Sequence, residues 1–166
     1  METATAKQIR ESYHFLTFLL DEREYGLELA KIQEICGYAP ITPIPNVPPH
    51  VRGVMNLRGT VLPVVDLRMK FHVPAVEYTK FTVIVIAMVA EKKVGLLVDA
   101  VSDVLQVSHD AMRPPPDFGS TVDTEFIMGV FQTRDRLAVA LNLERLLSER
   151  ELEPAQNGMN SLQLQS

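Results

Sequence analysis

Residues 53–67 read GVMNLRGTVLPVVDL, and residues 129–143 read GVFQTRDRLAVALNL. The two stretches align without a gap, and their apolar positions coincide at all but one position, where Leu57 aligns with Thr133. Upstream of them, Tyr25-Gly26-Leu27 is matched in the same order by Val94-Gly95-Leu96. Matching blocks in a fixed order indicate an internal repeat of about 70 residues, and a repeat constrains the architecture more than any single residue does.

The remaining sequence pattern is mostly that of β-structure. Short segments that are rich in β-branched residues and bounded by turn formers are predicted as strands at 13–20, 61–66, 81–88 and 137–142. Both faces of the first strand are largely apolar, which predicts burial on two sides. Apolar residues at helical spacing occur at 29–35, at 99–105 and most clearly at 143–152, where we predict a C-terminal helix.

The repeat predicts two packed β-barrels, because small sheets that close on themselves leave no exposed edges. We place the two subdomains at 13–76 and 77–152, within one fold unit that spans 13–152. A unit of about 60 residues buries only about 60% of its unfolded surface, so each subdomain is expected to need packing against the other to be stable. Flexible tails are predicted at 1–12 and 153–166, the second of which is polar and aperiodic.

Composition limits the classes of partner. The 166 residues carry a net charge of -5 and no basic cluster, whereas nucleic-acid binding needs a basic face that releases counterions. The single cysteine, Cys36, cannot form an internal disulfide, which predicts a cytoplasmic protein. The N-terminus lacks the apolar core of a signal peptide, and the longest apolar run, 81–90, is far shorter than the roughly 20 residues that span a bilayer. We expect neither nucleic-acid binding nor membrane insertion.

Signatures of catalysis and metal binding are missing from the sequence. The eight glycines form no phosphate-binding loop, and the four histidines lack the spacing of a zinc site. Cys36 is predicted as a buried structural thiol, since Ile35 and Gly37 supply nothing that lowers its pKa. Glu22 and Glu24, which flank a predicted turn, are interpreted as solvated charges. We therefore predict that the protein is not an enzyme and needs no cofactor or metal.

Turn and loop residues also recur at equivalent places in the two halves. Asp66 and Asn142 each follow a repeated strand, which predicts a structural role at a turn. Two proline-rich segments, 39–50 and 113–118, are predicted as loops or edges, because proline lacks the N–H that a central strand donates. The first segment contains P-x-x-P spacing, so a ligand for proline-recognising modules is an alternative function.

The most specific stretch, PNVPPHVRGVMNLRGTVLPVVDLRMKF at 45–71, resembles the signature of the bacterial chemotaxis coupling proteins, the CheW family. The segments at 15–38 and 94–118, with TEFIMGV and LNLERLL near the end, follow the same pattern, so the resemblance covers 13–147. It implies a mostly β fold of two packed five-stranded barrels with a C-terminal helix. It also implies a non-catalytic adaptor that couples methyl-accepting chemoreceptors to the chemotaxis histidine kinase, CheA. Such a protein would be recruited from the cytoplasm to membrane-associated receptor arrays.

The resemblance further implies a receptor-facing groove that includes Ile32, Glu34, Gly53 and Arg58. A groove binds helices through apolar anchors, with charged residues that fix the register. Ile32 is therefore expected as the anchor, and Glu34 and Arg58 as polar clamps. Gly53 would allow a backbone to approach closely. Structural roles stay open too, since Arg58 could serve a hairpin turn and Gly53 a positive φ.

A second group, Arg113, Asp117 and Phe118, is implied to meet the regulatory domain of the kinase in ring contacts. An exposed Phe beside an Arg is a common composition of binding hot spots. Packing of Phe118 over the end of a barrel is the alternative. Pro115 and the aspartate at position 117 depart mildly from the loop of the family. A small-molecule-binding double barrel outside chemotaxis is the remaining alternative function.

Overall fold

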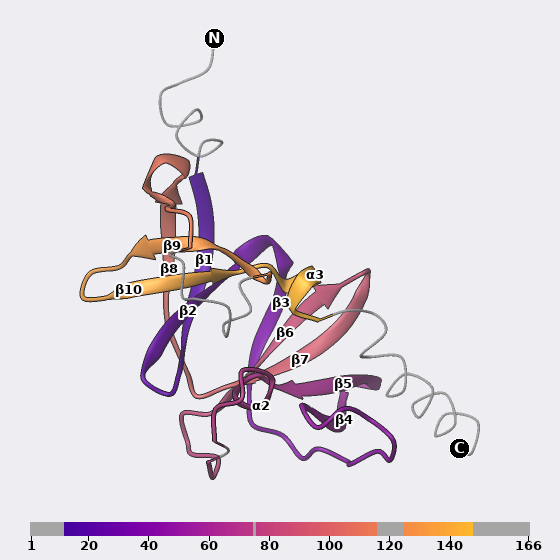
Figure 1. Cartoon of the computed structure of the whole chain (residues 1–166). Coiled ribbons are helices and arrows are strands. Elements are labelled where there is room, and N and C mark those ends of the chain that lie inside the picture. Colours follow the sequence, from indigo (N-terminus) through magenta and orange to yellow (C-terminus); the bar gives the residue numbers. More distant parts are fainter. Residues whose placement is uncertain (1–11, 75, 116–124, 148–166) are drawn as a thin grey trace.

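The computed structural model describes residues 12–74, 76–115 and 125–147, and Figure 1 shows how their elements are arranged. In chain order these are β1 (Ser12–Leu20), β2 (Arg23–Glu28), the 3-10 turn η1 (Leu29–Lys31), β3 (Ile32–Gly37), β4 (Val51–Leu57), β5 (Thr60–Asp66), α2 (Leu67–Lys70), β6 (Val83–Val89), β7 (Lys92–Val98), β8 (Ala100–Ser108), the 3-10 turn η2 (His109–Ala111), β9 (Ile127–Gln132), β10 (Leu137–Leu141) and α3 (Leu143–Leu146). The four predicted strands are confirmed as β1, β5, β6 and β10.

The strands form two five-stranded sheets, called sheet A and sheet B here. Sheet A has the order β8-β1-β2-β10-β9, and sheet B has the order β3-β6-β7-β5-β4. The repeat relates β1 and β2 to β6 and β7, and it relates β3, β4 and β5 to β8, β9 and β10. Under this correspondence the two strand orders are identical, including the parallel pairs β2–β10 and β7–β5. The mostly β class and the two five-stranded units are confirmed.

Each sheet takes strands from both halves of the sequence. Sheet A combines β1 and β2 with β8, β9 and β10, whereas sheet B combines β3, β4 and β5 with β6 and β7. The chain crosses between the sheets at η1 and returns at Asp99, the one residue between β7 and β8. One residue is too few for a hairpin, whose shortest common loop has two, so β8 must leave the sheet of β7. The boundary predicted between 76 and 77 therefore does not separate the two sheets.

The sheets do not close, so the expectation of two barrels needs correction. In each sheet, one isolated bridge joins the segment after one edge strand to the opposite edge strand. Thr42 pairs with Val54 of β4, and Arg113 pairs with Val130 of β9. The next position whose N–H would bond across an antiparallel pair lies two residues from the bridge, and there stand Pro40 in the segment of sheet B and Pro115 in that of sheet A, which have no N–H to donate. On that side of each bridge the ladder therefore does not continue.

Two segments with helical spacing of apolar residues are strands instead of helices. Residues 29–35 form η1 and most of β3, and residues 99–105 lie almost wholly in β8. The spacing misleads because Ile35 and Val104 are exposed and share no buried face with their apolar neighbours. These two residues are equivalent in the repeat, and each lies on an edge strand.

The largest hydrophobic cluster draws side chains from both sheets, among them Leu16 of β1, Val85 of β6 and Leu143 of α3. A smaller cluster around Ile84 belongs to sheet B alone, and another around Phe15 belongs to sheet A alone. The strand β1 supplies Phe15 to one cluster and Leu16 to another, which confirms its predicted burial on two sides. The two sheets therefore share the largest hydrophobic cluster, and each sheet has a smaller cluster of its own.

Asp66 and Asn142 cap the two short helices. The backbone N–H of Arg68 donates to Asp66 Oδ1 at 2.9 Å, and that of Arg145 donates to Asn142 Oδ1 at 3.2 Å. An N-cap side chain satisfies an N–H that has no partner within the helix. The predicted structural role of both residues at turns is confirmed.

The predicted C-terminal helix begins as α3, and residues 148–152 of that prediction lie outside the described part of the chain. The predicted tails at 1–12 and 153–166 also lie outside it, apart from Ser12, which begins β1. No helix within the described residues has the length and apolar character needed to cross a membrane.

Candidate protein-interaction site

The edge strand β3 presents two kinds of side chain. Ile32, Glu34 and Cys36 are half-buried, whereas Gln33 and Ile35 between them are exposed. Ile32, the predicted anchor, packs against the shared hydrophobic cluster, so part of its side chain is already used in internal contacts. The ladder from β3 to β6 shifts register between Ile32 and Glu34, a bulge that changes the direction of the following side chains.

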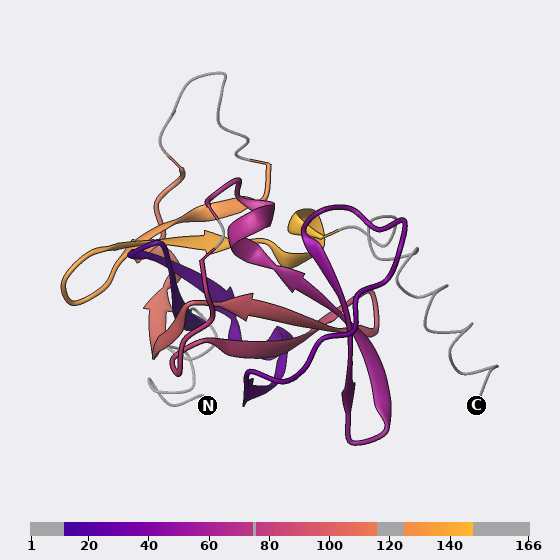
Figure 2. The same ribbon diagram turned by 90° about the horizontal axis from the view of Figure 1, so that it is seen from below.

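The β4–β5 hairpin presents Arg58 at its tip. Leu57 pairs with Thr60, which leaves a two-residue turn of Arg58 and Gly59 with φ values of 49° and 89°. Positive φ at both central residues matches the right-handed twist of the flanking strands. The N–H of Gly59 donates to Asn56 Oδ1 at 2.8 Å and so fixes the turn. Figure 2 shows the hairpin extending away from the body of the molecule.

Arg58 and Glu34 form an ion pair across the two edges of sheet B. Arg58 Nη2 donates to Glu34 Oε1, and the two side chains are 70% and 31% exposed. Glu34 lies on β3 at one end of the strand order, and Arg58 adjoins β4 at the other end. Together with the Thr42–Val54 bridge, the pair shows that sheet B curls until its edges approach each other. The structure therefore brings the two predicted polar clamps together.

The ion pair favours the charged form of both residues. The hydrogen bond from Arg58 lowers the pKa of the Glu34 carboxyl, and the same bond raises the pKa of Arg58. Nearby, burial raises the pKa of the Cys36 thiol, whose Sγ donates to the carbonyl of Ile84 at 3.6 Å. At neutral pH this surface therefore carries one carboxylate, one guanidinium and an uncharged thiol. Such a surface suits polar recognition, whereas a nucleophilic cysteine would need a lowered pKa.

Gly53, the third predicted receptor-facing residue, is buried on β4. A Cβ built on Gly53 would lie 2.0 Å from the carbonyl oxygen of Thr42, and its φ is 141°. The backbone that approaches Gly53 closely is therefore the chain's own bridging segment. Contact of Gly53 with a partner stays a prediction.

Arg113 lies on the other sheet. Its backbone N–H and C=O both bond to Val130 of β9 at 2.8 Å, and the residue is exposed. Asp117 and Phe118 fall outside the described residues. The predicted receptor-facing residues thus belong to sheet B, and Arg113, the one predicted kinase-facing residue that the structure describes, is joined to sheet A.

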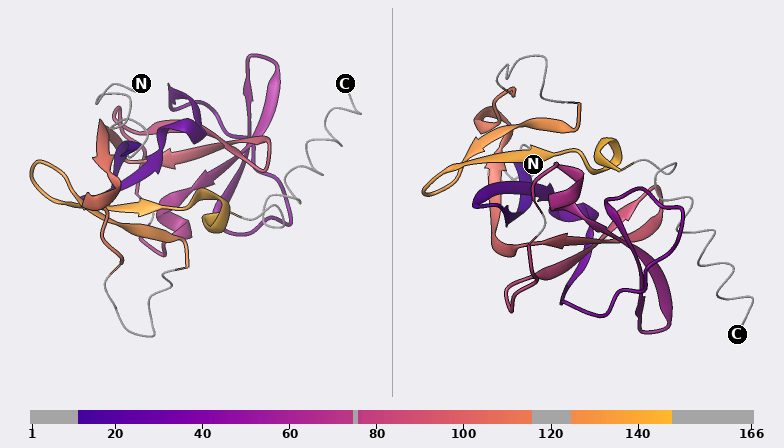
Figure 3. Two further views of the ribbon diagram at one scale, coloured as in Figure 1. Left: turned by 90° about the horizontal axis from the view of Figure 1, so that it is seen from above. Right: turned by 60° about the horizontal axis from the view of Figure 1, so that its bottom comes forward.

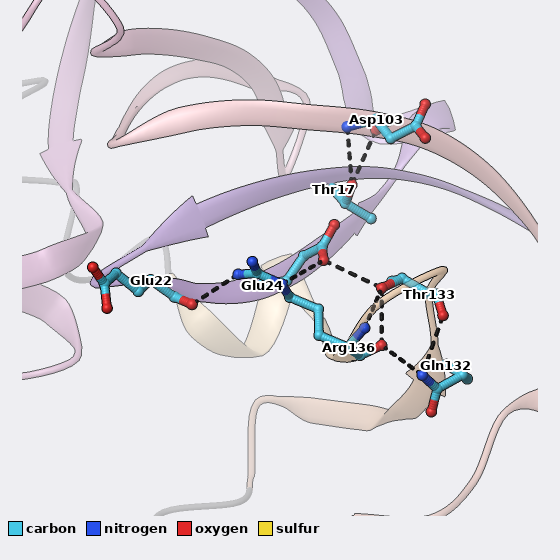
Figure 4. Close-up of polar contacts among 7 residues, drawn as sticks. All are labelled: Thr17, Glu22, Glu24, Asp103, Gln132, Thr133 and Arg136. Atoms are coloured by element: carbon cyan, nitrogen blue, oxygen red, sulfur yellow. Dashed lines mark hydrogen bonds and ion pairs between the residues drawn. The ribbon is translucent and has the colours of Figure 1, made fainter.

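Figure 4 shows a second polar cluster, at the β9–β10 hairpin, that sequence reasoning missed. The Glu24 side chain is 6% exposed, in contrast to the solvated charge expected from the sequence. Thr133 Oγ1 donates to Glu24 Oε2 at 3.4 Å, and Arg136 Nε lies 3.8 Å from the same oxygen. Arg136 Nη1 also donates to the carbonyl of Glu22 at 2.9 Å. A parallel pairing of β2 with β10 brings these residues together, and no local sequence pattern predicts that pairing.

The same figure shows how β1 and β8 are held at their bulge. The Thr17 hydroxyl accepts from the N–H of Asp103 at 3.0 Å and lies 3.3 Å from its carbonyl oxygen. Asp103 is the counterpart of Glu34 in the repeat. Within the described residues, no cluster of three or more His, Cys, Asp and Glu side chains could hold a metal ion.

The chain is similar to known proteins in both sequence and structure. Residues 14–151 match the family described as the CheW-like domain. The chain is 40% identical over 143 residues to a chemotaxis protein CheW of Klebsiella aerogenes, covering 86% of each protein. It is 39% identical over 140 residues to that of Rhizobium meliloti, covering 84% of this chain and 90% of the relative. Among solved structures it is similar to the scaffolding protein TtCheW from Thermoanaerobacter tengcongensis, with a TM-score of 0.76 and 32% identity. That match covers 84% of this chain and 94% of the other.

Proposed function

The chain belongs to the family of CheW-like domains, and from this membership we propose that it is a non-catalytic adaptor between chemoreceptors and the chemotaxis histidine kinase. The printed names of its relatives, chemotaxis protein and scaffolding protein, support this role. An adaptor needs two separate binding surfaces and no reactive group. In this proposal it acts in the cytoplasm, where receptor arrays recruit it to the membrane.

The observation that carries the receptor contact is the Glu34–Arg58 pair. Both side chains retain solvent exposure, and each has donors or acceptors left after pairing with the other. Ile35, which is also exposed, points to the opposite side of β3 and is not part of this surface. A helical hairpin offers polar residues between its apolar ones, and two fixed charges of opposite sign suit contact with those polar residues. Contact of the half-buried Ile32 with an apolar residue of the hairpin is part of the proposal. We therefore assign the cytoplasmic tip of a chemoreceptor to this part of sheet B.

The kinase contact is assigned to sheet A, at the segment that begins with Arg113. Arg113, whose side chain is exposed, itself forms the bridge that ties this segment to β9. A backbone already fixed by two hydrogen bonds loses little further backbone entropy when a partner binds. Contact of Arg113, Asp117 and Phe118 with the regulatory domain of the kinase is part of the proposal.

The proline-ligand alternative receives no support from the first proline-rich segment. Thr42, inside its P-x-x-P motif, makes two backbone hydrogen bonds to Val54, of 2.8 and 2.9 Å. Val47 of the same segment packs against the shared hydrophobic cluster. A proline ligand needs a free, extended segment, so we do not favour that function.

The test is co-sedimentation with membranes that carry receptor signalling fragments and with the kinase, scored for binding and for kinase activation. We expect Arg58→Glu to weaken receptor binding at least about tenfold, because it places like charges side by side in a contact that uses both. Kinase binding should stay unchanged. Arg134→Glu is the matched control, since Arg134 holds the same turn position in the repeated hairpin of sheet A.

The double variant Glu34→Arg/Arg58→Glu restores an ion pair with reversed polarity. If the two charges contact the receptor, the double variant stays defective, although its melting temperature matches that of the parent protein. Wild-type receptor affinity in the Arg58→Glu variant would contradict the assignment. Absence of binding by the parent protein to both receptor and kinase would contradict the adaptor function itself.

A further inference from the structure

Arg68, near the start of α2, is an almost buried arginine whose guanidinium faces oxygens of three different segments. Its side chain is 9% exposed. Nε donates to the carbonyl of Pro74 at 2.9 Å, and Nη1 donates to Asp99 Oδ2. Nη2 lies 3.5 Å from Asp21 Oδ1. All three guanidinium nitrogens are therefore engaged, as a buried cation requires.

The segments that meet at Arg68 belong to different sheets. Arg68 follows β5 of sheet B, whereas Asp21 lies in the β1–β2 turn of sheet A. Asp99 is the crossover residue between β7 of sheet B and β8 of sheet A. It also bonds to sheet A directly: Oδ2 accepts the N–H of Asp21 at 2.8 Å, and its own N–H donates to Leu19 O at 3.0 Å. This group, called the crossover clamp here, consists of Arg68, Asp99 and Asp21.

The repeat supplies an internal comparison at the other crossover. Glu144 of α3 is the counterpart of Arg68, and it forms an ion pair of 2.7 Å with Lys31 of η1. The polarity is reversed, and the two side chains are 40% and 46% exposed. Exposed pairs are screened by solvent and contribute little. One crossover is therefore held by a buried, multiply bonded arginine and the other by a weak surface pair.

Hydrophobic packing and the clamp restrain the sheets in different ways. The shared hydrophobic cluster opposes separation of the sheets, but apolar contact is non-directional and permits small rotations. A planar guanidinium bonded to carboxylates fixes both distance and angle. The hairpins β4–β5 and β9–β10 project from opposite sides of the molecule (Figure 3), so a small rotation at the crossover would displace their tips substantially.

We propose that Arg68 is a positioning residue, which acts through Asp99 and Asp21 to hold sheets A and B at one relative orientation. This orientation links the receptor contact on sheet B to the kinase contact on sheet A through a rigid body. The inference rests on the proposed adaptor function. Its consequence is that loss of the clamp impairs transmission between the two contacts and leaves each contact intact.

The functional test compares Arg68→Met with Lys31→Met, the equivalent change at the exposed crossover pair. Affinity is measured for the receptor fragment alone and for the kinase regulatory domain alone, followed by receptor-dependent kinase activity in the complete complex. For Arg68→Met we expect both affinities within about twofold of the parent protein and a loss of receptor-dependent activity of at least about fivefold. Lys31→Met should change neither the two affinities nor the receptor-dependent kinase activity. Arg68→Lys keeps the positive charge but lacks the planar guanidinium with its several N–H donors. We expect it to lose receptor-dependent kinase activity as well.

A direct measurement of orientation separates this inference from the adaptor function. Spin labels are placed at Gln33→Cys and Ser102→Cys, exposed and equivalent positions on the edge strands β3 and β8, in a Cys36→Ser background. We expect one narrow distance distribution in the parent protein and in Lys31→Met, and a broadened or shifted one in Arg68→Met. If Arg68→Met fails to fold, Asp21→Ala removes one arm of the clamp at a side chain that is 57% exposed.

An unchanged distance distribution in the folded clamp variant would overturn the inference, and so would undiminished receptor-dependent kinase activity. If the parent protein binds neither partner, the adaptor proposal fails, while the distance measurement still decides whether the clamp orients the sheets.

Discussion

Gly53 and Gly129 occupy equivalent positions in the repeat, and both lie against the chain's own backbone. A Cβ on Gly53 would be 2.0 Å from the carbonyl oxygen of Thr42, and a Cβ on Gly129 would be 2.5 Å from that of Arg113. Each carbonyl accepts one of the two hydrogen bonds of its bridge, from the N–H of Val54 and of Val130 respectively. A side chain at either glycine would therefore break the bridge that joins the edges of its sheet.

We expect Gly53→Ala to lower the free energy of unfolding by about 3 kcal/mol, through steric conflict with Thr42 and a φ that alanine rarely adopts. The measurement is urea denaturation followed by circular dichroism. Gly37→Ala, at a position of β3 where a Cβ would meet nothing within 4 Å, is the control. It should change the stability by less than about 1 kcal/mol. Equal losses in the two variants would show that the bridge contributes nothing to stability.

Among the elements, the two repeated hairpins differ in how they are anchored. The β4–β5 hairpin reaches across sheet B through the exposed Arg58 at its tip. The β9–β10 hairpin is instead held from its C-terminal side, where Arg136 reaches the buried Glu24 and the carbonyl of Glu22. One copy of the hairpin therefore pairs its tip arginine with a partly exposed carboxylate, and the other copy uses a partly exposed arginine to pair with a buried carboxylate.

We expect Arg136→Met to destabilise the protein by about 2 kcal/mol, because it removes a charged partner from the buried carboxylate of Glu24. Thermal unfolding of Arg136→Met and of the double variant Glu24→Gln/Arg136→Met measures the effect. The double variant should recover part of the loss, since a neutral amide costs less to bury. Arg134→Met, on the exposed side of the same turn, is the control. If Arg134→Met and Arg136→Met proved equally harmful, the buried pair would not be the cause.

At the scale of the whole molecule, the exchange of strands between the halves makes each half incomplete. The first half contains β3 and β5, whose partners β6 and β7 lie in the second half. It also contains the β1–β2 hairpin, whose neighbours β8 and β10 lie in the second half. An isolated two-stranded hairpin is at best marginally stable in water.

We therefore expect the separate fragments 1–76 and 77–166 to lack a cooperative unfolding transition as monomers. Mixed at equal concentration they should form a complex with the circular dichroism and melting transition of a folded β protein. Analytical ultracentrifugation distinguishes the complex from single fragments. A fragment that folds cooperatively as a monomer would restore the predicted division into sequential units.

Much of the fold could be read from particular residues. The blocks that begin at Gly53 and Gly129 predicted equivalent strands and turns, and Asp66 and Asn142 cap equivalent helices. The family resemblance predicted Glu34 and Arg58 as site residues, although the sequence does not show that the two side chains meet. Burial of Glu24 escaped prediction, because its position beside a turn is typical of a solvated charge.

The class of the strands, their repetition and the family depend on local side-chain pattern and on motifs, so the sequence was enough to reveal them. The sheet that each strand joins depends on long-range packing, because equivalent strands have equivalent patterns and can pair in more than one order. That choice depends on connections such as the single residue Asp99 and on the free energy of a core shared by both sheets. It places Arg58 beside Glu34 and Arg68 between the two sheets, and local pattern carries no information about either contact.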